Sequence, residues 1–176
     1  MAQANPDHDS IILIGMPGAG KSTIGVVLAK LCGLDFLDTD LAIQSGAGAT
    51  LQAILESEGY IHLRQLEEVV LLDVNLSRSV VATGGSVVYS EAAMQRLQSA
   101  GPVVYLQADL GTLEQRVASA PLRGIASEAG QSFAELYAER APLYERYADI
   151  TVDATAGTAD TVSALVAAAL SNHPNY

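Results

Sequence analysis

The feature that most constrains the fold is the segment Gly15-Met16-Pro17-Gly18-Ala19-Gly20-Lys21-Ser22, which matches the phosphate-binding pattern G-x-x-x-x-G-K-[ST] at every fixed position. It follows the apolar residues 11–14 and precedes a stretch of helical character at 23–31. Such a loop needs this setting, because its backbone N–H groups and the helix N-terminus together cradle phosphates. The sequence therefore predicts a nucleoside triphosphate site, and a glycine-rich turn without a ligand is the alternative.

The residue types in this loop predict separate tasks. Lys21 would contact the β- and γ-phosphates, and the hydroxyl of Ser22 would bind Mg²⁺. The remaining candidate nucleotide-binding residues of the loop and the following turn are Gly15, Gly18, Ala19, Gly20 and Thr23.

Length and charge limit the class of protein. A chain of 176 residues with 49% hydrophobic content fits a single domain, 1–176, with an ample core. Its net charge of −11 disfavours nucleic acid and anionic membranes as partners and favours a small-molecule acceptor. We expect a monomer.

The compartment is predicted from cysteine usage and hydropathy. Cys32 is the only cysteine, which excludes an intrachain disulfide and favours a reducing, cytoplasmic location. No apolar run approaches the roughly 18 residues of a membrane span, and the first ten residues do not resemble a signal peptide.

Short apolar runs alternate with longer segments of helical periodicity, which predicts a three-layer α/β fold with a parallel sheet. Strands are predicted at residues 11–14, 35–37, 79–82, 103–106 and 150–152. Helices are predicted near 20–31, 41–45, 50–58, 61–75, 91–99, 110–118, 132–147 and 158–170, with N-caps at Thr50, Ser90 and Asp109.

One internal segment breaks this periodicity. Residues 119–131 contain one proline and two glycines, and they follow the fourth predicted strand. They are a candidate lid that closes over the nucleotide, and an ordinary surface connection is the alternative. The ends, about 1–9 and 171–176, are predicted to be frayed.

Ligands of parallel sheets bind outside the carboxyl ends of the strands, so residues just after each strand are site candidates. Asp38 and Asp40 follow the second predicted strand. A phosphotransferase needs one carboxylate beside Mg²⁺ and one to orient and deprotonate the acceptor hydroxyl. We assign Asp38 to the metal and Asp40 to the acceptor, and a helix cap at either residue is the alternative.

Other candidates are glycines and arginines. Gly84 and Gly85 follow the third predicted strand and would allow a ligand anion to approach the backbone closely. Arg64 could bind a carboxylate through two hydrogen bonds, with Glu67 at i+3 fixing its guanidinium group, and a solvated surface ion pair is the alternative. Arg140, in the helix after the candidate lid, would be a surface charge if taken alone.

The ordered set of motifs resembles the shikimate kinase family over nearly the whole chain. The matching stretches are the phosphate-binding loop, Leu37-Asp38-Thr39-Asp40, Leu63-Arg64-Gln65-Leu66-Glu67, Thr83-Gly84-Gly85 and Arg140-Ala141-Pro142-Leu143-Tyr144. The resemblance implies a five-stranded parallel sheet of the nucleoside-monophosphate-kinase type, with strand order 2-3-1-4-5.

The resemblance also implies an activity, which is transfer of the ATP γ-phosphoryl group to the 3-hydroxyl of shikimate with Mg²⁺. It implies that Asp40 contacts the substrate hydroxyls and that Arg64 and Arg140 hold the substrate carboxylate. Gly84 and Gly85 would line the same pocket, and Arg116 would pack against adenine.

Three departures from the family pattern concern the acceptor side or the candidate lid. Ala120 stands where an arginine usually precedes the Pro-Leu of the lid, and Arg123 is the candidate replacement. Ser86 replaces the third glycine of a triplet. Leu55 and Leu63 stand where phenylalanines commonly face the substrate.

These departures keep two alternatives open beside shikimate kinase. One is a related kinase whose acceptor is another small hydroxy acid, such as quinate or homoserine. The other is a nucleotide-binding homologue with weakened transfer activity, because loss of a charge around the transferred phosphoryl group can cost orders of magnitude in rate.

Overall fold

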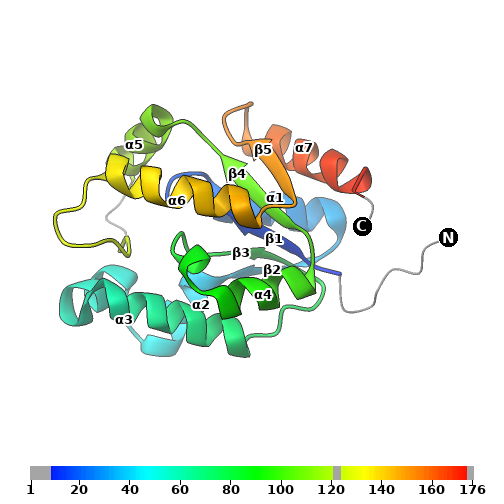
Figure 1. The fold of residues 1–176 in the computed structure, drawn as a ribbon. Helices are drawn as coiled ribbons and strands as arrows, with labels where there is room; N and C mark the ends of the chain where they lie inside the picture. Colours follow the sequence, from blue (N-terminus) through cyan, green and yellow to red (C-terminus); the bar gives the residue numbers. More distant parts are fainter. Residues whose placement is uncertain (1–8, 121–123, 174–176) are drawn as a thin grey trace.

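Parallel strands form the centre of the fold in the order β2-β3-β1-β4-β5 (Figure 1). The structure is a computed structural model that describes residues 9–120 and 124–173. The predicted three-layer α/β class and the strand order are confirmed. The strands are β1 (Ile11–Ile14), β2 (Asp35–Asp38), β3 (Ser79–Ala82), β4 (Val103–Gln107) and β5 (Ile150–Asp153).

The central strand β1 is buried on both faces. Its four residues are all 0% exposed, which explains why they form a continuous apolar run rather than an alternating one. Leu13 pairs with Ala82 of β3 and with Val104 of β4. Asp38 of β2 also pairs with Ala82, so the carboxyl ends of β1, β2 and β3 meet at one edge of the sheet.

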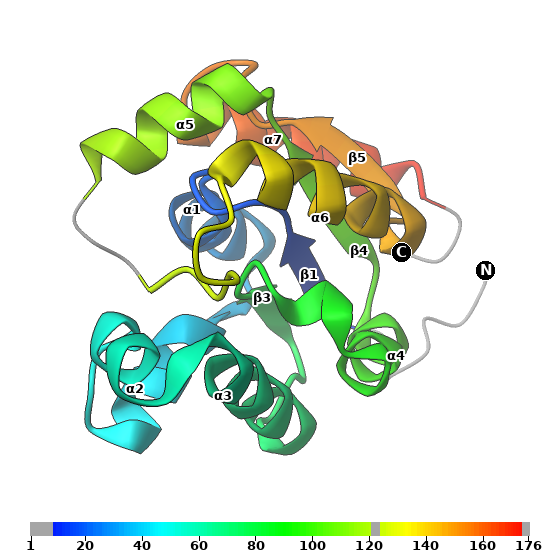
Figure 2. The same cartoon turned by 60° about the vertical axis from the view of Figure 1, so that its left-hand side comes forward.

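Helices cover both faces of the sheet. Figures 1 and 2 show α1 and α7 on one side, with α4 and α6 on the other. The described helices are α1 (Lys21–Cys32), α2 (Thr39–Ala47), α3 (Leu51–Asp73), α4 (Glu91–Ala100), α5 (Leu110–Ser119), α6 (Phe133–Tyr147) and α7 (Ala159–Ser171). A short 3₁₀ helix, η1 (Val87–Tyr89), which the sequence reading did not predict, precedes α4.

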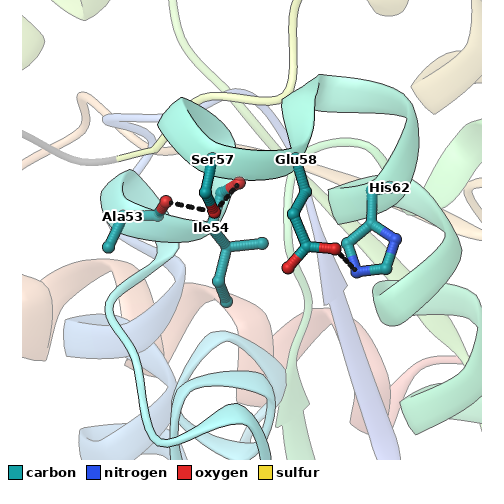
Figure 3. Close-up of polar contacts among 5 residues, drawn as sticks. All are labelled: Ala53, Ile54, Ser57, Glu58 and His62. Atoms are coloured by element: carbon teal, nitrogen blue, oxygen red, sulfur yellow. Dashed lines mark hydrogen bonds and ion pairs between the residues drawn. The ribbon is translucent and has the colours of Figure 1, made fainter.

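Helix α3 replaces the two helices predicted on either side of Gly59. Its backbone bends at Gly59, whose φ of 83° and ψ of 172° are not helical. Figure 3 shows the flanking contacts: Ser57 Oγ donates to the carbonyl oxygens of Ala53 and Ile54, and His62 Nε2 lies 3.0 Å from Glu58 Oε2 across the bend. The bend precedes the part of α3 that carries Arg64 and Glu67, and residues on both sides of it, Leu51, Ile54 and Leu63, share one apolar cluster with Ile43 of α2.

Two apolar clusters hold the layers together. The larger surrounds the sheet and includes all of β1 together with Leu28 of α1 and Val166 of α7. The smaller joins α2, α3 and the segment before α6, and its buried members are Ile43, Leu51, Ile54, Leu63 and Ala126. The second cluster gives α2 and α3 a core of their own beside the sheet.

The predicted caps are present. Side-chain oxygens of Thr50, Ser90 and Asp109 accept hydrogen bonds from the backbone N–H groups of Ala53, Ala93 and Thr112. In the described part of the chain, no helix combines the length and the apolar character that crossing a membrane requires.

Candidate functional site

The site is built at the sheet edge where β1, β2 and β3 end. Thr83 ties β3 to β1, because its backbone N–H and its Oγ1 donate to the Leu13 carbonyl oxygen at 3.2 and 3.0 Å. The Gly84 N–H donates to Thr39 Oγ1 at 3.0 Å, which ties the same turn to the start of α2. These bonds fix Gly84 beside the phosphate-binding loop and the two aspartates.

The phosphate-binding loop depends on glycine at several positions. Gly18 and Gly20 have φ of 87° and 92°, a region that side chains other than glycine rarely adopt. A Cβ on Gly15 would lie 2.7 Å from the Leu106 carbonyl oxygen. The glycine spacing therefore meets requirements of both backbone conformation and close packing.

Lys21 lies folded back on this loop. Its Nζ donates to the carbonyl oxygens of Gly15 at 2.6 Å and Met16 at 3.0 Å. Burial lowers the pKa of the Lys21 ammonium to about 8, and the charges of Asp40 and Glu67 oppose that shift. The structure thus places the lysine between the loop and the acidic residues of the sheet edge.

Arg116 bridges the two walls of a pocket next to the loop. Its guanidinium group donates to the carbonyl oxygens of Gly18 and Ala154, each at 3.3 Å. The pocket has a volume of about 170 Å³ and is lined by Gly18, Ala19, Gly20, Thr23, Ile24, Arg116, Ala154, Gly157, Ala159 and Val162. The residues after β5 in this wall were not identified from the sequence.

Asp38 is the N-cap of α2. Its Oδ1 accepts hydrogen bonds from the N–H groups of Asp40 at 3.0 Å and Leu41 at 3.3 Å, which is the cap considered as the alternative from sequence. Its assignment to a metal stays a prediction. Asp40 faces Gly84, since a Cβ added to Gly84 would lie 3.0 Å from Asp40 Oδ1.

Glu67 is a second carboxylate at the same glycine. The side chain is 4% exposed, Ser86 Oγ donates to its Oε2, and its Oε1 has no hydrogen-bond partner. A Cβ on Gly84 would lie only 2.2 Å from Oε1. Burial raises the pKa of Glu67 to about 7, and the Ser86 hydrogen bond partly offsets that shift.

The expected pairing of Glu67 with Arg64 is wrong, because the structure pairs Glu67 with Ser86. The Arg64 guanidinium lies over the ring of Tyr89 at 3.8 Å from its centroid, and Nη2 donates to the Ala126 carbonyl oxygen at 3.3 Å. Neighbouring positions on a helix allow a contact but do not enforce it when a buried hydroxyl competes.

Arg140 joins Arg64 at the same carbonyl. Arg140 is 1% exposed, and its Nη2 also donates to the Ala126 carbonyl oxygen. A Cβ on Gly85 would lie 3.0 Å from Arg140 Nη1, and the Tyr144 hydroxyl donates to the Gly85 carbonyl oxygen. The structure thus brings Arg64, Arg140 and the Gly84-Gly85 turn together, as the family resemblance implies.

Some expectations fall outside this constellation. Arg123, the candidate lid arginine, lies outside the described residues. Ala120 is the C-cap of α5, and Leu63 is buried in the smaller apolar cluster with Leu55 packed against that cluster. Among the described residues, no group of three or more His, Cys, Asp or Glu is arranged to hold a metal ion.

Comparisons with known proteins agree with this geometry. The family model described as shikimate kinase matches residues 17–171. Shikimate kinase 2 of Enterobacter sp. (strain 638) is 36% identical over 163 residues, covering 90% of this chain and 94% of that protein. The shikimate kinase of Halorhodospira halophila (strain DSM 244 / SL1) is 36% identical over 168 residues, covering 94% and 95%.

Solved structures show the same similarity. Shikimate kinase from Acinetobacter baumannii in complex with shikimate has a TM-score of 0.82 and 32% identity, covering 96% of this chain and 97% of that one. Shikimate kinase from Aquifex aeolicus has a TM-score of 0.79 and 28% identity, covering 95% and 99%. With the sheet order, the phosphate-binding loop and the paired arginines in place, these matches show that the chain belongs to the shikimate kinase family.

Proposed function

We propose that this protein is a shikimate kinase that transfers the γ-phosphoryl group of ATP to the 3-hydroxyl of shikimate. The products are ADP and shikimate 3-phosphate, a step on the route to chorismate and the aromatic amino acids. The observation that carries the proposal is the convergence of Arg64 and Arg140 on one oxygen atom, the Ala126 carbonyl, beside Gly84 and Gly85.

Two guanidinium groups that share an oxygen have the arrangement needed to bind a carboxylate. Arginine presents several N–H donors in a planar fork, and such charge-assisted bonds are stronger than neutral ones. The Nε of Arg64 is buried without a partner and is a further donor for this purpose. A substrate carboxylate can therefore replace the Ala126 carbonyl as the acceptor of both arginines.

The acceptor hydroxyl would then lie near Asp40. Asp40 faces Gly84 and attracts the Lys21 ammonium through its charge. We assign Asp40 the role of general base, which accepts the hydroxyl proton as the new oxygen–phosphorus bond forms and the bond to ADP breaks. Lys21 offsets the negative charge on the transferred group, because phosphoryl transfer depends mainly on positioning and charge neutralisation.

The phosphate-binding loop and the pocket beside Arg116 fit ATP. The positive φ angles of Gly18 and Gly20 suit a loop whose backbone N–H groups surround phosphates, and Arg116 links this loop to the wall after β5. The residues that would hold Mg²⁺ are Ser22, at the start of α1, and Asp38. The metal ion would neutralise charge on the phosphate oxygens.

A second candidate is a kinase for another small hydroxy acid, such as quinate or homoserine. It is favoured by Ser86, because the Ser86 hydroxyl donates a hydrogen bond to Glu67 close to Gly84 and Gly85. A third candidate, a nucleotide-binding homologue with weakened transfer, rests on Ala120 at the position of a usual lid arginine.

An acceptor panel separates the three. ADP release is measured with ATP and Mg²⁺ in the presence of shikimate, quinate or homoserine, each up to millimolar concentration. We expect shikimate-dependent turnover that exceeds the other two. Preference for another acid supports the second candidate, and tight ATP binding without turnover on any acceptor supports the third.

A further inference from the structure

Tyr89 contacts both arginines of the acceptor site. It is the last residue of η1 and follows the Gly84-Gly85 turn by a few residues. The Arg64 guanidinium carbon lies 3.8 Å from the centroid of the Tyr89 ring, and that of Arg140 lies 5.3 Å from it. In addition, Arg140 Nε donates to the Tyr89 hydroxyl at 3.2 Å. One side chain therefore touches both cations.

The surroundings of Tyr89 compensate the two positive charges. The face of an aromatic ring is electronegative and attracts guanidinium groups that lie over it. The Tyr89 hydroxyl in turn donates to Glu139 Oε1, and Gln131 Nε2 donates to Glu139 Oε2 at 2.7 Å. These contacts place the Glu139 carboxylate next to the Tyr89 hydroxyl, which accepts a hydrogen bond from Arg140.

Two arginines held close together repel each other when no anion lies between them. Each also loses rotamer freedom when it is fixed on a ligand. A partner that fixes both side chains before the substrate arrives lowers this cost and improves affinity. Tyr89 has the contacts to act in this way.

We propose that Tyr89 is a positioning residue for acceptor recognition, whose ring holds Arg64 and whose hydroxyl orients Arg140 toward the carboxylate of the substrate. The inference rests on the proposed function, because it assigns Tyr89 a role in binding the acid that the two arginines clamp. It predicts that Tyr89 contributes to acceptor affinity and to discrimination in favour of carboxylates, rather than to ATP binding.

The test compares Tyr89→Leu and Tyr89→Phe with the wild type in steady-state assays. For Tyr89→Leu we expect the KM for shikimate to rise about 10- to 30-fold, since two cation–π contacts and a hydrogen bond to a charged group are lost. Tyr89→Phe keeps the ring and should raise that KM only about 3- to 5-fold. The KM for ATP should stay within about twofold in both variants.

Tyr147 provides a matched control. It is a half-buried tyrosine that lies under another guanidinium, that of Arg146, at 5.6 Å. Tyr147→Leu should leave the KM for shikimate unchanged. If it raises that KM as much as Tyr89→Leu does, the effect is a general loss of packing and the positioning role is overturned.

A double-mutant cycle tests whether Tyr89 acts through Arg64. In an Arg64→Met background, Tyr89→Leu should raise the KM for shikimate by clearly less than it does in the wild type. Shikimate methyl ester gives a second readout, because the preference for the free acid over the ester should shrink in Tyr89→Leu. An equal Tyr89→Leu effect in both backgrounds contradicts the proposal.

The outcomes distinguish this inference from the proposed function. A wild type without shikimate-dependent turnover overturns the proposed function. A wild type that turns over shikimate, with a Tyr89→Leu variant whose KM for shikimate is unchanged, overturns the role of Tyr89 alone. If Tyr89→Leu does not fold, Tyr89→Phe still tests the role of the hydroxyl. An unchanged KM for shikimate in Tyr89→Phe would overturn the proposal that the hydroxyl orients Arg140.

Discussion

The donor and acceptor halves of the site are built in different ways. The donor half is centred on the phosphate-binding loop, a continuous segment between β1 and α1, to which Arg116 of α5 and the wall after β5 are added. The acceptor half takes Asp40 from α2, Arg64 and Glu67 from α3, and Arg140 from α6. Backbone geometry therefore defines the donor half, whereas contacts between side chains far apart in the sequence define the acceptor half.

The two halves also rest on different cores. The loop follows β1, whose side chains are completely buried in the large cluster around the sheet. Helices α2 and α3 near the acceptor residues pack on the smaller cluster, which includes Ala126 from the segment before α6. The departures from the family pattern, such as Ser86 and Leu63, lie on the acceptor side. The two halves of the site therefore differ both in the origin of their residues and in the apolar cluster on which they rest.

Substitution of Lys21 should give the largest effect and impair phosphoryl transfer while leaving acceptor binding nearly intact. Lys21→Ala removes the buried ammonium that lies on the carbonyls of Gly15 and Met16. We expect kcat to fall about 1000-fold, because charge neutralisation around the transferred group is lost. Shikimate binding, measured by calorimetry, should change less than about threefold. Lys30→Ala, on the exposed end of α1, is the control and should be fully active.

Substitution of Arg64 should weaken acceptor binding while leaving ATP binding nearly intact. Arg64→Ala removes a charged partner of the acceptor carboxylate and should raise the KM for shikimate about 100-fold. The KM for ATP should stay close to that of the wild type. Arg146→Ala, an exposed arginine on α6, is the control. An Arg64→Ala enzyme with an unchanged KM for shikimate would count against the clamp.

The pH dependence of stability should show that the buried Glu67 carboxylate in the acceptor half destabilises the folded protein once it is ionised. Its pKa is raised to about 7 from the ordinary 4.5, so the folded protein binds more protons than the unfolded chain between these values. The free energy of unfolding therefore falls as the pH rises through this window, by about 2 to 3 kcal/mol from this group.

The measurement compares urea unfolding of the wild type and Glu67→Gln at pH 5 and pH 8. Between these pH values, the wild type should lose more stability than the variant. Glu114→Gln, on the exposed face of α5, is the control and should behave as the wild type does. Parallel pH profiles for the wild type and Glu67→Gln would show that Glu67 has an ordinary pKa.

Two glycines give the smallest expected effects and sharpen the comparison further. Gly84→Ala would bring a Cβ to 2.2 Å from Glu67 Oε1 and 3.0 Å from Asp40 Oδ1. We expect the KM for shikimate to rise about 10-fold, with a stability loss of about 1 to 2 kcal/mol. Gly46→Ala is the matched control, since a Cβ there meets nothing within 4 Å and α2 continues through it. It should stabilise the protein by up to about 1 kcal/mol.

The sequence predicts the phosphate-binding loop of the donor half and its place between β1 and α1, but not the wall after β5. A local pattern such as that of Gly15 to Ser22 carries both the backbone geometry and the chemistry, so no distant contact is needed to interpret it. Five strands were likewise placed within a residue of their ends, because buried parallel strands are short apolar runs. The Gly59 bend was also visible as a break between two helical patterns.

The acceptor half was predicted only in part. The family resemblance implied that Asp40, Arg64, Gly84 and Arg140 share one pocket. The predicted partner of Glu67 was wrong, because helix spacing says nothing about the Ser86 hydroxyl 19 residues further along the chain. Tyr89 was missed, since it lies in a single turn of 3₁₀ helix without periodicity. Its contacts with Arg64 and Arg140 depend on how η1, α3 and α6 pack together, which the local sequence does not show.

The most direct test of the account is the kcat/KM of the wild type for shikimate compared with that for shikimate methyl ester, at saturating ATP and Mg²⁺. Because the account gives the acceptor carboxylate two arginines, it predicts efficient turnover of shikimate and a kcat/KM for the ester about 100-fold lower. Equal kcat/KM values for the two compounds, or no turnover of shikimate, would contradict it.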